Sequence, residues 1–176
     1  MSEVKTNKVS PSTGTAFTLG DSGDTFTLPS GATLTVSGTS TIASLGASTA
    51  SGTLSMADNI VSRPVVKDYG ETVNAIGAIG GGTQDIDLES GNVVTGTVDT
   101  STTTFTFSNP PTTGTAGSFT LILTNGGSQT VNWPGAVDWA GSTAPTLTTS
   151  GVDVITFTTI DAGTTYYGFA AGLDMS

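Results

Sequence analysis

The chain contains neither cysteine nor histidine. Their absence excludes disulfide bonds, thiol nucleophiles, histidine-based catalytic triads and zinc sites built from Cys or His ligands. Basic residues are scarce as well. The four in the chain lie within residues 1–67, where four acids balance them, so the net charge of −10 belongs to the remainder. A stretch without Lys or Arg cannot neutralise phosphates, which makes nucleic acid and anionic lipid poor partners.

Long apolar runs are also missing. The first residues, MSEVKTNKVSPS, are polar, and no apolar segment approaches the length of a membrane span. We therefore expect neither signal-directed secretion nor membrane insertion. The lack of cysteine fits a chain that assembles in a reducing cytoplasm and is exposed outside the cell afterwards.

Threonine and glycine are abundant instead. Only 10% of the residues are charged and 35% are hydrophobic, which differs from the charge-rich composition of disordered chains. Thr and Gly are weak helix formers, whereas Thr suits a pleated, half-exposed surface. The composition therefore predicts an all-β protein.

The clearest strand signals lie in residues 114–169. Residues 118–125 place Phe119, Leu121 and Leu123 on one face, and residues 152–160 show the same period of two. Turns are predicted at Asn125-Gly126-Gly127 and Asp161-Ala162-Gly163. Strands are predicted over residues 84–88, 92–98, 102–108, 118–125, 128–133, 145–149, 152–160 and 164–169. Their number and spacing predict an antiparallel β-sandwich or jelly roll over residues 83–176.

Residues 1–66 have a different character. They contain short apolar bursts of four or five residues and a predicted turn at Pro29-Ser30-Gly31. Such bursts bury too little surface to offset the chain entropy of an isolated molecule. We expect a fibre-like shaft of short β-strands, in which copies of the chain wrap round a common axis and share a thin core. The alternative is an arm that docks on another protein.

Residues 67–82 are expected to form a neck or linker. Val66, Tyr69, Val73 and Ile76 fall at helical spacing, but Gly70 lies among them and Pro64 precedes them. These two residues limit any helix to one or two turns. A short neck helix and an irregular connection both fit the pattern.

Four aromatic residues are candidates for a ligand-binding platform: Trp133, Trp139, Tyr166 and Tyr167. Exposed aromatic rings on a β-sandwich can present flat faces to sugar rings. The alternative is that each Trp fills the core. Tyr166 and Tyr167 are adjacent, so in a strand they must point to opposite faces.

The acidic residues suggest no catalytic site. Asp85, Asp87 and Glu89 would share one face of a strand and could attract Ca²⁺, but Gly96 stands where an EF-hand loop requires Glu. A solvated sheet face is therefore the favoured interpretation. The sequence offers neither a bracketed carboxylate pair, nor a phosphate-binding glycine loop, nor a base for a Ser or Thr nucleophile. We expect no enzyme activity, metal or cofactor.

Several stretches resemble bacteriophage proteins. GDSGDTFTLPSGATLTVSG (residues 20–38) resembles the opening of tail-fibre and other virion structural proteins, especially of marine phages. FTFSNPPTTGTAGSFTLILTNGG (residues 105–127), together with residues 130–169, resembles a module of phage tail-fibre-like proteins. RPVVKDYGETV (residues 63–73) is a third similar stretch. The resemblance covers most of the chain and carries no catalytic residues.

The resemblance implies a structural virion protein, assembled in the host cytoplasm and exposed on the outside of the particle. It would be a homotrimeric fibre or spike on the tail or head, bound to other virion proteins through its N-terminal segment and reaching toward a host surface glycan or protein. Two alternatives remain open. One is a capsid decoration or cement protein, and the other is a carbohydrate-binding module, which requires exposed Trp side chains.

Overall fold

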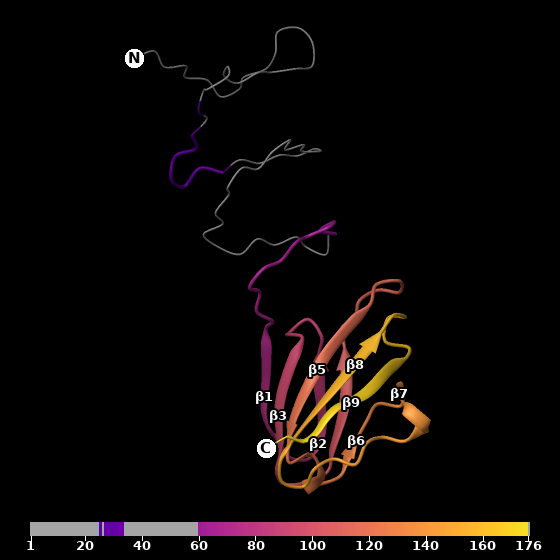
Figure 1. Ribbon diagram of the computed structural model, residues 1–176. Coiled ribbons are helices and arrows are strands. Elements are labelled where there is room, and N and C mark those ends of the chain that lie inside the picture. Colours follow the sequence, from indigo (N-terminus) through magenta and orange to yellow (C-terminus); the bar gives the residue numbers. More distant parts are fainter. Residues whose placement is uncertain (1–24, 26, 34–59, 176) are drawn as a thin grey trace. The chain divides into compact units, whose positions relative to one another are not determined.

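The computed structural model describes residue 25, residues 27–33 and residues 60–175 (Figure 1). The chain divides into two units, Met1–Val61 and Ser62–Ser176. In the first unit, the predicted turn at Pro29 is confirmed, because the Ala32 N–H donates to the Pro29 carbonyl oxygen over 3.0 Å. Residues 1–24, 26 and 34–59 of the predicted shaft lie outside the described residues, and residues 60–66, its last part, are exposed and form no strand.

The second unit consists of β-strands joined by loops and two 3₁₀ turns. The strands are β1 (Val73–Ile79), β2 (Gly82–Asp87), β3 (Val93–Val98), β4 (Thr103–Ser108), β5 (Gly117–Thr124), β6 (Val131–Asn132), β7 (Val137–Trp139), β8 (Val152–Thr159) and β9 (Tyr166–Met175). The 3₁₀ turns are η1 (Gly126–Ser128) and η2 (Ala140–Ser142). This confirms the all-β prediction for the described part of the chain. Among those residues, no helix is long and apolar enough to cross a membrane.

The chain winds back and forth between two sheets. Strands β1, β3 and β5 belong to a six-stranded sheet of order β1-β3-β5-β8-β9-β7, and β2, β4 and β6 form a three-stranded sheet in that order. Each crossing to the second sheet and back returns the chain in the same direction. Successive coils therefore stack as parallel strands: Val73 lies beside Val93, and Val93 lies beside Thr120. Figure 1 shows β1, β3, β5 and β8 side by side.

The strand directions correct the prediction of an antiparallel sandwich or jelly roll. The pairs β1–β3, β3–β5, β2–β4, β4–β6 and β7–β9 are parallel. Only β5–β8 and β8–β9 are antiparallel among the described strands. A period of two places side chains on alternate faces in both kinds of sheet, so the sequence pattern could not distinguish them.

The core lies between the two sheets. Ile86 and Phe105 of the three-stranded sheet and Val94, Leu121 and Ile155 of the six-stranded sheet are all 0% exposed and belong to one cluster. Each of these residues alternates along its strand with a more exposed neighbour. The predicted alternation of faces along residues 118–125 and 152–160 is thus confirmed.

The predicted neck, residues 67–82, contains strand β1 rather than a helix or an irregular link. A β-bulge between Ala75 and Gly77 leaves Ile76 as an extra residue opposite Gly96. The extra residue shifts the alternation, so Ile76 and Ile79 both pack into the core. Because of the bulge, these two core residues are three positions apart in the sequence, a spacing that resembles that of a helix.

The C-terminal hairpin holds a buried carboxylate. Asp153 is 0% exposed, and it accepts hydrogen bonds from the Thr148 N–H (2.7 Å), the Thr148 hydroxyl (2.6 Å) and the Asp174 N–H (3.2 Å). Residues 145–149, predicted as a strand, instead form the segment that supplies two of these donors. The predicted turns at Asn125 and Asp161 are present, with Asn125 (φ 55°) and Ala162 (φ 55°) in the left-handed region.

A substitution at Gly77 tests the backbone conformation of the bulge in β1. Its φ is +73°, and a Cβ added there would meet no atom within 4 Å, so Gly77→Ala changes only the backbone energy. We expect this variant to lower the free energy of unfolding by about 1–2 kcal/mol, as the left-handed conformation costs an L-residue. Urea titration of the full chain would measure the loss.

Gly70→Ala is the matched control, since Gly70 also has free space around its Cα but no positive φ. It should stay within about 0.5 kcal/mol of the parent chain, as surface substitutions usually do. Equal stability of the two variants would contradict the bulge.

Candidate ligand-binding face

The two Trp side chains pack against the core and against each other. The Trp133 ring stacks on Phe105, with ring centroids 5.4 Å apart, and meets Trp139 edge-to-face at 5.3 Å. Trp139 also contacts the Phe157 ring edge-to-face at 5.7 Å. Both Trp side chains are partly buried, which favours the core interpretation over a free platform.

The position of Trp139 depends on a close approach to strand β9. Trp139 lies beside Gly168 in the parallel β7–β9 pair. A Cβ added at Gly168 would stand 2.6 Å from the Trp139 ring. The ring therefore lies directly over the β9 backbone, and any side chain at position 168 would displace it.

Tyr166 and Tyr167 point to opposite faces, as predicted. Tyr166 is 3% exposed and packs edge-to-face on Phe107 at 5.0 Å. Burial raises the pKa of its phenol, and the negative charges of Asp161 and Asp85 raise the pKa further. Within the described chain its hydroxyl has no hydrogen-bond partner. Tyr167 is 44% exposed on the other face. The four predicted aromatic residues therefore do not form one platform.

The three acidic residues considered for Ca²⁺ do not share a face. Asp85 and Asp87 lie on β2, whereas Glu89 lies in the following turn. Asp85 accepts hydrogen bonds from the hydroxyls of Thr106 (2.7 Å) and Ser108 (2.5 Å). In the part of the chain that the structure describes, no group of three or more acidic side chains is placed to hold a metal ion.

Asp87 is held by its neighbours in the same way. It accepts hydrogen bonds from the Asn109 amide (2.9 Å), the Glu89 N–H (3.0 Å) and the Ser90 hydroxyl (3.2 Å). These bonds keep the pKa of Asp87 below its ordinary value of 3.8, with the Asn109 amide contributing most. The side chains thus bind one another across β2, β4 and the adjoining turn, as expected for a solvated sheet face.

The outer face of the six-stranded sheet is different, because its central strands carry hydroxyl and apolar side chains without charge. Cross-strand neighbours form rows that run from β3 through β5 to β8. One row contains Val93, Thr120 and Thr156, and the next contains Thr95, Ile122 and Val154. We call this surface, made by the outward side chains of β3, β5, β8 and β9, the outer face.

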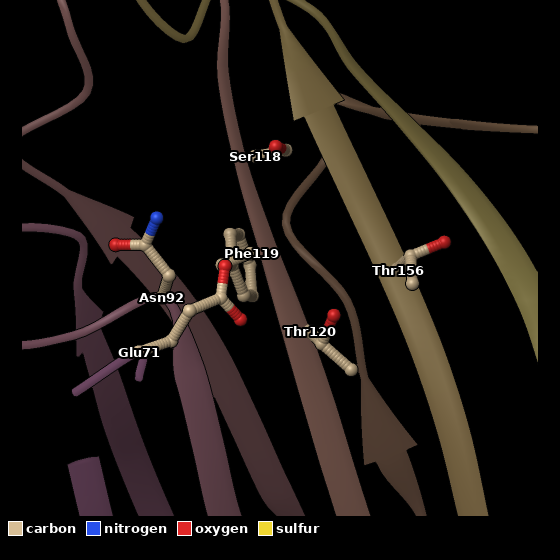
Figure 2. Close-up of a pocket in the computed structure, with 6 residues that line it drawn as sticks. All are labelled: Glu71, Asn92, Ser118, Phe119, Thr120 and Thr156. Carbon is tan, nitrogen blue, oxygen red and sulfur yellow. The ribbon is translucent and has the colours of Figure 1, made fainter. Parts of the chain in front are cut away.

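A shallow pocket of about 190 Å³ opens beside one end of the outer face. Figure 2 shows Glu71 and Asn92 on one side, Thr156 on the other, and Ser118 and Thr120 on the strand between them. The pocket lies where the chain enters β1 and β3, and the Thr120 N–H donates to the Asn92 carbonyl oxygen over 2.8 Å there. Phe119 also lines the pocket.

The polar side chains of the pocket differ from the carboxylates on the opposite sheet in their hydrogen bonds to described residues. None of the five polar side chains that line it hydrogen-bonds to another side chain of the described residues, in contrast to Asp85 and Asp87 on the opposite sheet. Together they offer hydroxyls that donate and accept, an amide that does both, and the Glu71 carboxylate, which only accepts. Glu71 is the charged residue among them.

Two aromatic side chains of β9 lie on the outer face next to strand β8, which supplies Thr156 to the pocket. Phe169 lies directly opposite Thr156, and Tyr167 lies opposite Thr158, which is itself paired with Ser118. Phe169 is 54% exposed and Tyr167 is 44% exposed, since both alternate with the buried Tyr166 and Gly168. The sequence prediction included Tyr167 but missed Phe169, although the period of two from Tyr167 could have revealed it.

No family model matches the chain, and searches of curated proteins and of solved structures find no match either.

The contact between Trp139 and Gly168 predicts the effect of a single methyl group. We expect Gly168→Ala to displace the indole and lower the free energy of unfolding by about 1–3 kcal/mol, as overpacking does. The Trp fluorescence spectrum should shift at the same time, because the ring becomes more exposed. Gly135→Ala, where a Cβ meets nothing within 4 Å, is the control. An unchanged spectrum in Gly168→Ala would contradict the packing.

The turn between β8 and β9 predicts a dependence on pH. Asp161 accepts hydrogen bonds from the Thr165 N–H (2.9 Å) and the Thr159 hydroxyl (3.0 Å). These bonds hold the pKa of Asp161 below 3.8, the Thr165 N–H contributing most. A lowered folded-state pKa stabilises the fold above the unfolded value, and this contribution is lost as the pH falls through the folded pKa. Stability should therefore fall below about pH 4.

Thermal unfolding between about pH 6 and pH 2 would measure this loss. Asp161→Asn should show a smaller fall with acidification than the parent chain. Asp138→Asn, at an exposed position on β7, should follow the parent curve. An Asp161→Asn curve parallel to that of the parent would rule out the turn as the source of the effect.

Proposed function

We propose that the chain is a non-enzymatic structural protein of a phage virion, which displays its C-terminal unit on the outside of the particle toward the host surface. The first unit, residues 1–61, attaches to other virion proteins, and the second, residues 62–176, makes contact with the host. The resemblance to phage tail-fibre-like proteins supports the assignment to a phage virion. The outer face supports the proposed contact with the host surface.

The uncharged centre of the outer face is the observation that carries this proposal. Its central strands present hydroxyl and aliphatic side chains in aligned rows, and two aromatic rings extend these rows on β9. Side chains of this kind bind a surface by shape, hydrogen bonds and apolar contact. Aromatic residues are enriched in the buried cores of interfaces, where charged residues are depleted.

A homotrimer is the oligomer that we propose. The first residues of the second unit include Val65 (99% exposed), Tyr69 (71%) and Val66 (62%). A close group of exposed apolar side chains is typical of an interaction site. Burial of this segment by neighbouring copies would remove the apolar surface from water, at about 25 cal/mol per Å².

The location can be tested on intact particles. Antibodies against the full chain should label the exterior of phage particles from a lysate in which the chain is produced, as seen by immunogold electron microscopy. Labelling confined to disrupted particles, or the absence of the chain from purified particles, would contradict the proposal. Labelling spread over the whole head would favour the capsid decoration alternative over a fibre.

The oligomer can be tested by light scattering on a sizing column. The full chain should have the mass of a trimer, and Val65→Asp should shift it toward the monomer, because a charge would be buried between copies. Thr113→Asp adds the same charge in an exposed loop and should remain trimeric. A monomeric parent chain, or a trimer that tolerates Val65→Asp, would count against this interface.

A further inference from the structure

We propose that the pocket beside the outer face and the rings of Tyr167 and Phe169 form one binding site for a neutral saccharide of at least two hexose units. This inference rests on the proposed function in that it names the host ligand which the displayed face would contact. It assigns a site made of Glu71, Asn92, Thr120, Thr156, Tyr167 and Phe169.

The pocket has the polarity and size for one sugar ring. Its volume of about 190 Å³ is smaller than the roughly 300–1,000 Å³ of pockets that enclose drug-sized ligands. A hexose presents hydroxyl groups that both donate and accept hydrogen bonds, and the pocket lining contains both acceptors and donors. The Glu71 carboxylate can accept from two neighbouring hydroxyls, while the Asn92 amide and the Thr156 hydroxyl can donate to sugar oxygens.

The aromatic rings supply the apolar half of the site. A hexose ring has C–H groups on its faces, and an exposed Phe or Tyr ring offers a flat apolar surface to them. Phe169 is directly opposite Thr156, and side chains paired in this way have Cβ atoms about 4.5–5.5 Å apart. A sugar ring over Phe169 would therefore adjoin a ring held in the pocket.

The proposed site is long enough for more than one sugar ring. Thr120 and Phe169 both lie beside Thr156, on opposite sides, so two strand spacings separate them. That separation is about 10 Å, longer than a single hexose ring covers. The site thus selects a chain of at least two sugars, with one unit in the pocket and the next on β9.

Charge decides between neutral and acidic saccharides. Glu71 is the charged residue that lines the pocket, Asp138 lies beside Tyr167 in the β7–β9 pair, and the chain carries a net charge of −10. These carboxylates repel uronic and sialic acids, and the described residues place no base within the pocket lining. Neutral hexoses avoid this repulsion.

The geometry also disfavours a peptide ligand bound by strand addition. Strands β3, β5 and β8 are interior to the sheet, so their backbone groups already pair on both sides. A peptide in this mode needs a free sheet edge. The outer face offers side chains, and these are the groups that recognise a sugar.

Titration of the isotopically labelled full chain by NMR would test the site. The probes are maltose, cellobiose and lactose, with sialyllactose as the acidic counterpart of lactose. At least one neutral disaccharide should shift the amide signals around Thr120, Thr156 and Phe169, and sialyllactose should bind more weakly than lactose. The site is overturned if no neutral disaccharide shifts these signals, or if sialyllactose is the tightest ligand.

Three variants localise the binding. Phe169→Ser should weaken affinity about tenfold or more, a factor that corresponds to about 1.4 kcal/mol. Met175→Ser is the matched control: it lies on the same strand, is 53% exposed against 54% for Phe169, and is paired with Val152 away from the pocket. Thr156→Val keeps the shape and removes one hydroxyl, and should weaken binding severalfold. Unchanged affinity in Phe169→Ser and Thr156→Val would reject the site.

The outcomes separate this inference from the proposed function. Particles that carry the chain outside while the chain binds no neutral disaccharide would reject the saccharide site and leave the virion role standing. Saccharide binding by a chain that is absent from particles would reject the virion role and leave the site standing.

Discussion

The fold depends on the aromatic contacts that join its two sheets. Phe157, at the centre of the six-stranded sheet, stacks on Phe119 and meets Phe107 of the other sheet and both Trp rings. Each well-placed aromatic pair contributes about 0.5–1.5 kcal/mol beyond the burial of its surface. With few charges and no disulfide to hold the sheets together, this cluster and the aliphatic residues beside it provide most of the cohesion of the second unit.

The same alternation that builds the core creates the outer face. Every side chain directed inward along β5 and β8 leaves its neighbour directed outward, and the outward set is rich in threonine. Regular pairing aligns these side chains in rows, because the parallel pair β3–β5 and the antiparallel pair β5–β8 both keep a constant register. The pocket forms where the rows meet the segment that enters β1. The alternation of side chains along the strands thus produces both the core and the surface for which we propose ligand binding.

The acidic residues differ in their hydrogen-bond partners, although their side chains are chemically similar. Asp153 is buried and fully occupied by backbone and hydroxyl donors, and Asp85 is bound by Thr106 and Ser108. Glu71 makes no side-chain contact of this kind with the described residues and lines the pocket instead. The sequence drew attention to the three acids around Asp85 because of their spacing. The pocket instead indicates Glu71 as the acidic residue that is placed to bind a ligand, although no local sequence pattern distinguishes it.

The sequence by itself determined the all-β class, the turns at Asn125 and Asp161 and the alternating faces of the two longest predicted strands, because these depend on local conformation and a period of two. It also excluded cysteine and histidine chemistry. Strand direction, the inclusion of β1 and β7 in the sheet, and the pairing of Phe169 with Thr156 were decided only by the tertiary structure. Parallel and antiparallel strands share one side-chain period, and the bulge before Gly77 shifts the alternation of β1. Contacts between residues far apart in the chain were needed to resolve both.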